Sequence, residues 1–238
     1  MSPMLSLRVI TALCLALAAP PSAHAAPGDT FASGYADAAM ALMSPCPEAA
    51  ARCFGVRLHV TEGDDATPVV TGAWLAEQVA HAELVFADVA VGFEVVAVVP
   101  GGAELHRVLT RAERDAIGRE AYDRRVIDVW VVAQLANVDD PGDIRGVHWR
   151  DRERRSDRWI LLSAVAPAQV LAHELGHFFG LPHNDTPGSL MNNIGDPTPA
   201  VERRFAAAEQ RKVTGSARRF AKARAPVDRR APETKRSR

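Results

Sequence analysis

The sequence predicts an α+β domain with about five strands and several helices. Segments in which apolar and polar residues alternate predict half-buried strands, and one nearly continuous apolar segment predicts a central strand. Segments with apolar residues at helical spacing predict helices that pack on these strands. Hydrophobic residues make up 47% of the 238 residues, so the chain can bury the core of one medium domain.

Residues 1–25 have the features of a signal peptide. A single positive charge precedes an apolar run over 9–19, and an A-x-A cleavage site ends at Ala25. The run of about eleven residues is too short to cross a bilayer comfortably. We therefore expect a secreted protein, extracellular or periplasmic, that keeps no transmembrane anchor after signal cleavage. An anchor that stays uncleaved is the alternative.

Residues 26–53 form an Ala-rich N-terminal segment, with a short helix expected over 30–43. The segment is either a pro-segment removed on activation or a part of the fold. Cys46 and Cys53 are the two cysteines left once the signal peptide, with Cys14, is removed. An oxidising compartment favours a disulfide between them. Its short loop would shape the segment more than stabilise the fold.

The domain itself is expected over 54–221, beginning with a strand at 54–61 in which apolar and polar residues alternate. An amphipathic helix follows over 71–87, with Thr71 as its N-cap. A second strand over 92–99 ends at a Pro-Gly-Gly turn. These elements supply two strands of the sheet and a helix to back it.

The next elements complete the sheet. Residues 109–122 predict a charged, exposed helix, and the apolar run 126–135 predicts the central strand. Short strands are expected at 146–150 and 159–163, on either side of a charged loop. Pro167 suits the first turn of a helix and opens a further helix there.

That further helix carries the clearest chemistry in the sequence. Residues four apart lie about 40° apart around a helix, so His173 and His177 project side by side toward one ion. Glu174 is offset by about 100°, where it can reach a metal-bound water without being a ligand. Gly180 suits a left-handed helix end. His183 can then return as the third ligand, which leaves the open position typical of catalytic zinc.

This spacing, H-E-x-x-H-x-x-G-x-x-H followed by a Met-turn, is that of the metzincin metalloproteases, which the chain resembles over about 25 residues. The Met-turn candidate is Met191, in Ser-Leu-Met and eight residues past His183. This short spacing resembles the matrixin branch most. Asn193 stands where astacins and serralysins usually have a tyrosine, so no tyrosine ligand is expected.

The resemblance implies a zincin-like metzincin catalytic domain. Such a domain has a twisted mixed sheet of about five strands, a backing helix, a His-bearing active-site helix, and a small C-terminal subdomain with the Met-turn and a C-terminal helix. It implies a secreted zinc endopeptidase with one catalytic Zn²⁺, in which Glu174 is the general base for zinc-activated water. Met191 would form an apolar floor beneath the three imidazoles. An edge strand, for which 146–150 is the candidate, would pair with extended protein or peptide substrates.

Two other interpretations of the motif stay open. One is a catalytically inactive zinc-binding module of metzincin fold that holds a protein or an anionic surface, although the intact Glu174 argues against it. The other is a His-rich core helix without metal. The chain after Met191 would shape the S1′ pocket, but no feature in it predicts a substrate preference.

Several weaker signals accompany the motif. Cys53 invites comparison with the matrixin cysteine switch, but its flanking residues differ and the disulfide is favoured. The acidic turn 139–143 could donate carboxylates to Ca²⁺, although a solvated turn is favoured. Asp185 either braces the loop after His183 or is an ordinary turn residue. The remaining histidines are expected to be surface or hydrogen-bonded residues: His59, His81, His106 and His148.

The C-terminal part is basic. A helix is expected over 201–220, and residues 222–238 predict a disordered tail. Residues 201–238 carry 13 of the 28 basic residues but only 4 of the 29 acidic ones, so the rest of the chain is acidic. Nucleic acid is not an expected partner of an exported protein. Contact of the tail with an anionic surface stays open.

Overall fold

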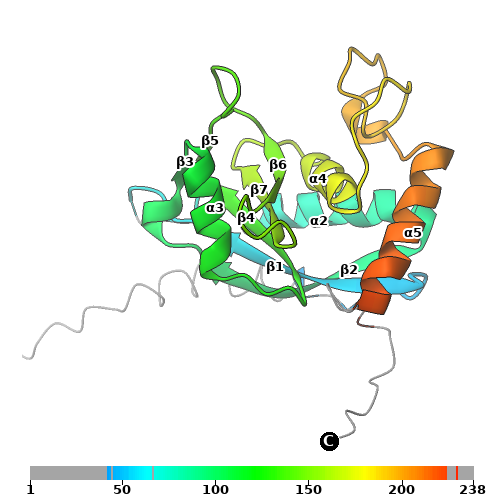
Figure 1. Ribbon diagram of the computed structural model, residues 1–238, viewed down its shortest axis with the longest axis horizontal. Coiled ribbons are helices and arrows are strands. Elements are labelled where there is room, and N and C mark those ends of the chain that lie inside the picture. Colours follow the sequence, from blue (N-terminus) through cyan, green and yellow to red (C-terminus); the bar gives the residue numbers. More distant parts are fainter. Residues whose placement is uncertain (1–41, 44, 66, 224–228, 230–238) are drawn as a thin grey trace, which may run out of the picture.

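The computed structural model describes residues 42–43, 45–65, 67–223 and 229. The predicted signal peptide, nearly all of the helix expected in the N-terminal segment, and most of the basic tail lie outside these residues. In the described part, a five-stranded sheet in the order β2-β1-β4-β7-β6 is combined with helices α2 to α5 (Figure 1). Of the described helices, none is both long enough and apolar enough to cross a membrane.

Four strands of the sheet are parallel to one another: β1 (Arg52–Val60), β2 (Val91–Pro100), β4 (Ile127–Val132) and β7 (Arg158–Ser163). The fifth, β6 (Gly146–Arg150), is antiparallel to β7 and lies at the edge. The strands predicted over 92–99 and 146–150 are confirmed, and they lie at the two ends of the sheet. A mixed sheet of this kind needs long crossovers between its parallel strands, and helices supply them.

The central position of β4 explains its apolar sequence. Ile127, Val129 and Val131 face the larger core, which they share with the sheet residues of β1 and β7. Trp130 and Val132 face a second core on the opposite side of the sheet. Because both faces are buried, apolar residues occupy every position of the strand except Asp128, which is held by Arg57 and His59.

The central strand is shorter than predicted, because it ends at Val132 rather than at residue 135. Gln134–Leu135 form a separate strand, β5, which pairs in parallel with β3 (Arg107–Val108) in a two-stranded sheet. The Ala136 amide then donates to the Val108 carbonyl at 2.9 Å. The apolar run therefore spans two sheets.

Helices α2 (Gly72–Phe86) and α4 (Val170–Phe178) pack against the larger core. Thr71 is the N-cap of α2, as predicted, and its hydroxyl accepts from the Trp74 amide at 3.2 Å. Helix α4 begins three residues later than Pro167. The turn before it is fixed by Gln78, whose side-chain amide donates to the carbonyls of Ala166 and Pro167 and whose oxygen accepts from the Leu171 amide.

Helix α3 (Arg111–Glu120) covers the second core, so that α3 and α4 lie on either side of β4 and β7 (Figure 1). The expectation that this charged helix is exposed is wrong for one of its faces. Gly118 lies directly against the Trp159 ring, which would overlap any added Cβ. Asp115 on this face is buried. Its carboxylate accepts hydrogen bonds from the Trp149 indole and from Arg152.

The helix expected over 201–220 is also displaced. A short 3₁₀ turn, η3 (Ala200–Glu202), is followed by an extended segment and then by α5 (Ala207–Ala223). The extended segment pairs with the Met-turn region, since the Leu190 amide donates to the Arg204 carbonyl at 2.9 Å. These backbone groups therefore cannot join a helix. The helix in turn continues past residue 220 into the start of the predicted tail.

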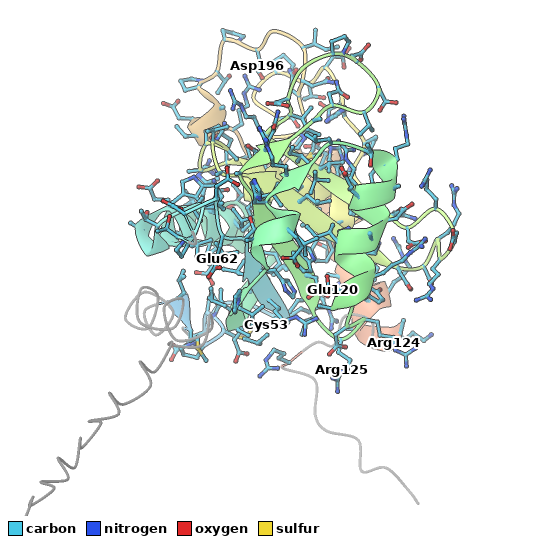
Figure 2. The ribbon with its side chains drawn as sticks, turned by 90° about the vertical axis from the view of Figure 1, so that its left-hand side faces the viewer. Cys53, Glu62, Glu120, Arg124, Arg125 and Asp196 are labelled. Carbon is cyan, nitrogen blue, oxygen red and sulfur yellow. A yellow bond between two sulfur atoms is a disulfide. The ribbon has the colours of Figure 1, made fainter. Side chains whose placement is uncertain are left out.

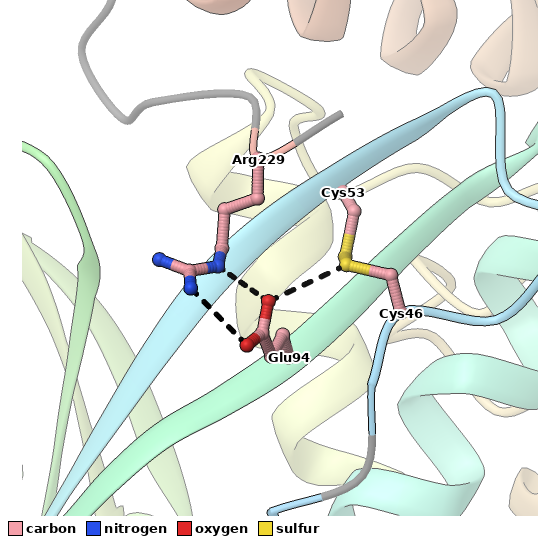
Figure 3. Close-up of a disulfide and its surroundings, with 4 residues drawn as sticks. All are labelled: Cys46, Cys53, Glu94 and Arg229. Carbon is pink, nitrogen blue, oxygen red and sulfur yellow. Dashed lines mark hydrogen bonds and ion pairs between the residues drawn. A yellow bond between two sulfur atoms is a disulfide. The ribbon is translucent and has the colours of Figure 1, made fainter. Parts of the chain in front are cut away.

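A disulfide joins Cys46 to Cys53 as predicted, with their Cα atoms 6.0 Å apart. It connects the segment before β1 to the second residue of that strand. In Figure 3, Glu94 of β2 lies between this disulfide and Arg229, with which it forms an ion pair. The Arg229 amide donates to the Cys53 carbonyl at 2.7 Å. One residue of the predicted tail is therefore placed against the sheet.

Candidate metal centre

Three histidine side chains converge at the end of α4. His173 and His177 project from one face of the helix, and His183 follows the turn at Gly180. Gly180 has the predicted left-handed conformation, with φ +93°. The Nε2 atom of His183 lies 3.1 Å from that of His173 and 3.0 Å from that of His177. The local spacing in the sequence therefore brings three ring nitrogens to one point.

The rings are oriented so that these nitrogens are free to bind an ion. His173 Nδ1 lies 2.8 Å from the Leu190 carbonyl, and His177 Nδ1 lies 2.7 Å from the Leu181 carbonyl. A carbonyl only accepts hydrogen bonds, so each Nδ1 must carry a proton and each Nε2 presents a lone pair. Burial lowers the pKa of His173 to about 4 and also lowers the pKa values of the other two histidines. The three imidazoles are therefore neutral at pH 7.

The donor set fits zinc. A tetrahedral site with Zn–N bonds of 2.0–2.1 Å places its nitrogens about 3.3 Å apart, within a few tenths of an ångström of the distances from His183 Nε2 to the other two. Imidazole is a preferred ligand of zinc. Among the described residues, the other group with metal-ligand spacing is Cys46, Cys53 and Glu94, whose two sulfur atoms are already joined in the disulfide.

Glu174 is a buried carboxylate next to the three histidines, with 5% of its surface exposed. Its Oε2 accepts from the His148 amide of β6 at 2.7 Å. Burial raises the pKa of Glu174 to about 8, against the opposing effects of that hydrogen bond and of the Arg114 charge. The close approach of strand and helix requires Gly146, since a Cβ there would lie 2.6 Å from Val170 Cγ1 and 3.0 Å from Glu174.

Met191 is fully buried and packs against α4 between its two histidines. The contact is at Gly176, where an added Cβ would lie only 2.6 Å from the Met191 sulfur. The glycine inside the H-E-x-x-H motif therefore provides the space for the Met-turn. The predicted residue is thus placed directly below the helix that carries the ligands.

A hydrogen-bond network behind this turn was not predicted. Glu209, in the first turn of α5, accepts from the Ser189 hydroxyl at 2.9 Å and from the Asn184 side-chain amide. The Ser189 hydroxyl in turn accepts from the Met191 amide at 3.0 Å. Glu209 therefore ties together the Met-turn and the loop that carries the third histidine. The brace of that loop is Asn184, whereas Asp185 is exposed.

The histidines and Glu174 line a cleft of about 760 Å³. Strand β6, the predicted edge strand, borders the cleft with an edge on which no other described strand pairs. The opposite wall includes the chain after the Met-turn, which Arg203 holds by donating at 3.0 Å to the carbonyls of Asn192, Asp196 and Thr198. An extended peptide therefore has room to lie along the sheet edge and over the histidines.

The scattered histidines differ in their surroundings. His59 is buried, stacks on Trp130 at 4.0 Å and contacts Asp128 at 2.9 Å. His81 is also buried, and His106 pairs with an exposed aspartate. These three lie outside the cleft. His148 is the exception, because it lines the cleft and its buried Nε2 has no partner among the described residues.

The cysteine-switch interpretation does not hold, since Cys53 is in a disulfide and lies at the opposite end of the molecule from Asp196, which belongs to the chain after the Met-turn (Figure 2). In the acidic turn, Asp139 pairs with Arg111, and Asp143 accepts from the Gln134 amide at 3.2 Å. These carboxylates therefore have protein partners, and calcium binding there stays a prediction.

No protein-family model matches the chain, and no curated protein matches it. Among solved structures, it is similar to an archaemetzincin from Methanopyrus kandleri, with a TM-score of 0.49 and 15% identity over 72% of this chain and 98% of that one. A chaperone–substrate complex gives a TM-score of 0.47 and 16% identity over 71% of this chain and 34% of the other. At TM-scores below 0.5, neither likeness establishes the family or the function.

Proposed function

We propose that the protein is a zinc-dependent endopeptidase of the metzincin type. The observation that carries the proposal is the convergence of three histidine Nε2 atoms, with that of His183 within 3.1 Å of the other two, beside the buried carboxylate of Glu174 in an open cleft. Within the metzincins, the eight-residue spacing from His183 to Met191 supports the matrixin type. Three histidine ligands with one open position are typical of catalytic rather than structural zinc.

The residues of the cleft have separate roles in peptide hydrolysis. A zinc ion held by the three histidines would supply a Lewis acid for the scissile carbonyl and lower the pKa of the attacking water toward neutrality. The charge of the zinc ion would offset the burial that raises the pKa of Glu174 and keep the carboxylate ionised. Glu174 then takes the proton from that water and returns it to the leaving amine. Its Oε2 is held by the His148 amide, so the carboxylate has a fixed orientation. The outer edge of β6, apart from the His148 amide, aligns the substrate as an added strand.

Further parts of the proposal concern location and partners. We propose that residues 1–25 direct export and that the mature chain acts outside the cytoplasm on protein or peptide substrates, without a nucleic-acid partner. The Cys46–Cys53 disulfide supports an oxidising compartment. Contact of the basic tail with an anionic surface is a separate proposal, which a tail-deletion variant and anionic vesicles would test.

Metal content and hydrolysis test the proposal together. The purified mature protein should contain about one zinc ion per chain. Glu174→Ala should keep the zinc and lose about 10²–10⁴-fold in the rate of peptide hydrolysis, since proton transfer supplies a factor of this size. His177→Ala should lose the zinc. His106→Ala, which removes a histidine outside the cleft, is the matched control and should retain both properties.

Two results would contradict the proposal. If Glu174→Ala hydrolyses peptides at the wild-type rate, the general-base assignment is wrong. If the protein binds zinc but cleaves no member of a proteome-derived peptide library, the inactive binding module replaces the peptidase. A positive cleavage profile from the same library would also define the S1′ preference.

A further inference from the structure

The cleft has an excess of positive charge. It is lined by four arginines and two acidic residues: Arg114, Arg145, Arg150, Arg203, Asp139 and Glu174. Neither acidic residue neutralises these arginines, since Asp139 pairs with Arg111 outside the cleft and Glu174 is the proposed general base. Arg203 is also committed, because its guanidinium donates to three backbone carbonyls. Three arginines therefore remain for a ligand.

Two of the three stand at the ends of the edge strand. Arg145 immediately precedes β6 and Arg150 is its last residue, and both are exposed. Neither forms an ion pair with an acidic side chain of the described part of the chain. Arg150 also lies directly opposite Arg158 of β7 in the strand register. Like charges in such a cross-strand pair repel each other, so this end of the cleft would gain from an anion.

The third arginine, Arg114, is buried in the rim of the cleft, with 3% of its surface exposed. Its Nη2 donates to the Ala136 carbonyl at 2.6 Å, and its guanidinium lies 4.9 Å from the centre of the Trp149 ring. The buried Nε has no hydrogen-bond partner among the described residues. An unpaired donor on a buried cation is unfavourable, and an acceptor that enters the cleft would satisfy it.

From these observations we infer that the cleft selects peptides with an acidic side chain on each side of the scissile bond. The inference rests on the proposed peptidase function and names its substrate class. Glu174 contacts the His148 amide, midway along β6, so the general base lies between Arg145 and Arg150. The two flanking acids would therefore lie on either side of the reacting bond.

Strand geometry sets the spacing of these acids. In an antiparallel pair, directly opposite residues share one face of the sheet. The substrate residues opposite Arg145 and Arg150 are five positions apart, a distance of about 16–17 Å along a strand. Residues an odd number apart point to opposite faces, as these two arginines also do. The expected pattern is an acidic residue, four further residues, and a second acidic residue.

Peptide cleavage by charge tests the inference. Three quenched-fluorescent peptides would carry Glu, Gln or Lys at both flanking positions and be otherwise identical. At low ionic strength, kcat/KM for the Glu peptide should exceed that for the Gln peptide about tenfold, at about threefold for each exposed ion pair. The Lys peptide should be the poorest substrate. Because the pairs are exposed, about 0.5 M salt should remove most of the preference.

Variants assign the preference to the two arginines. Arg145→Gln and Arg150→Gln should each reduce the ratio of Glu to Gln peptide by about threefold. Arg155→Gln, which removes an exposed arginine of the loop between β6 and β7, is the matched control and should leave the ratio unchanged. Equal reduction by all three variants would mean that only the net charge of the protein matters and would overturn the inference.

Binding measured by fluorescence anisotropy separates this inference from the proposed function. If the wild type cleaves all three peptides equally well and binds them equally, the inference is wrong and the peptidase stands. If it cleaves none but binds the Glu peptide about tenfold more tightly, with both arginines required, the inference stands and the peptidase fails. If a sulfated oligosaccharide displaces the Glu peptide and binds more tightly, a polysaccharide replaces the acidic peptide and the inference is overturned.

Discussion

Replacing Glu209 by alanine would test whether the C-terminal helix positions the metal site. Glu209 has 9% of its surface exposed and accepts from the Ser189 hydroxyl at 2.9 Å and from the Ala206 amide at 2.7 Å. It also accepts from the Asn184 side chain. In the alanine variant, these donors would lose their acceptor at a largely buried position.

A buried donor left unpaired costs about 1–3 kcal/mol. Because Glu209→Ala removes the acceptor of several donors at once, it should lower the free energy of unfolding by about 2–4 kcal/mol. The loop with His183 and the turn with Met191 would also be less ordered. Outer partners of metal ligands typically contribute 10–100-fold to metal affinity, and we expect a loss of about tenfold for Glu209→Ala.

Urea denaturation would measure stability, and competition with a chromophoric chelator would measure zinc affinity. Glu202→Ala is the matched control, because it removes an exposed carboxylate from the neighbouring η3 turn. Glu209→Gln keeps an acceptor oxygen and should lie between the wild type and the alanine variant. If Glu209→Ala matches Glu202→Ala in urea midpoint and binds zinc within twofold of wild type, the positioning role is refuted.

Three further predictions concern stability. Gly118→Ala should lower the free energy of unfolding by about 3 kcal/mol, because the added methyl overlaps the Trp159 ring; urea denaturation measures this, and an unchanged midpoint would contradict the packing described. The Arg119 hydrogen bond holds the pKa of Asp151 below its usual range, so the pair stabilises the fold above about pH 4 and less as the pH falls. Arg119→Gln should therefore lower Tm at pH 7 and differ less from wild type at pH 3, whereas an equal difference at both pH values would exclude the ion pair as the cause. Removal of metal with a chelator should lower Tm, by an amount equivalent to about 4 kcal/mol for zinc supplied at 1,000 times its Kd, and re-addition of zinc should restore it.

The local part of the site could be predicted from the sequence because its geometry depends on short spacings. His173 and His177 share a helix face whatever the rest of the fold does, and Gly180 permits the left-handed residue that turns the chain toward His183. The edge strand at 146–150 was predictable for a similar reason. The charged loop that separates it from the strand at 159–163 is a feature of the neighbouring sequence, and its place at the edge followed from the resemblance to the metzincins.

The remaining features depend on residues far apart in the chain. Glu209 contacts Ser189 across 20 positions, and Gln78 reaches the turn before α4 across 88 positions. No spacing rule links such pairs. The central strand was predicted too long because an apolar run does not reveal that Gln134 leaves one sheet to pair in another. The helix expected to begin at residue 201 fails because its first backbone groups pair with the Met-turn instead.

The two carbonyls that orient the helix-borne rings, those of Leu181 and Leu190, come later in the chain than the helix itself. A nascent polypeptide that ends just after His183 would contain every metal ligand, yet it would lack the acceptor for His173 and the sulfur that packs under Gly176. Zinc should therefore bind less tightly until the chain beyond the ligands has been made and has folded back. Metal content would report completion of the C-terminal part of the domain, which makes it a test of correct maturation as well as of activity.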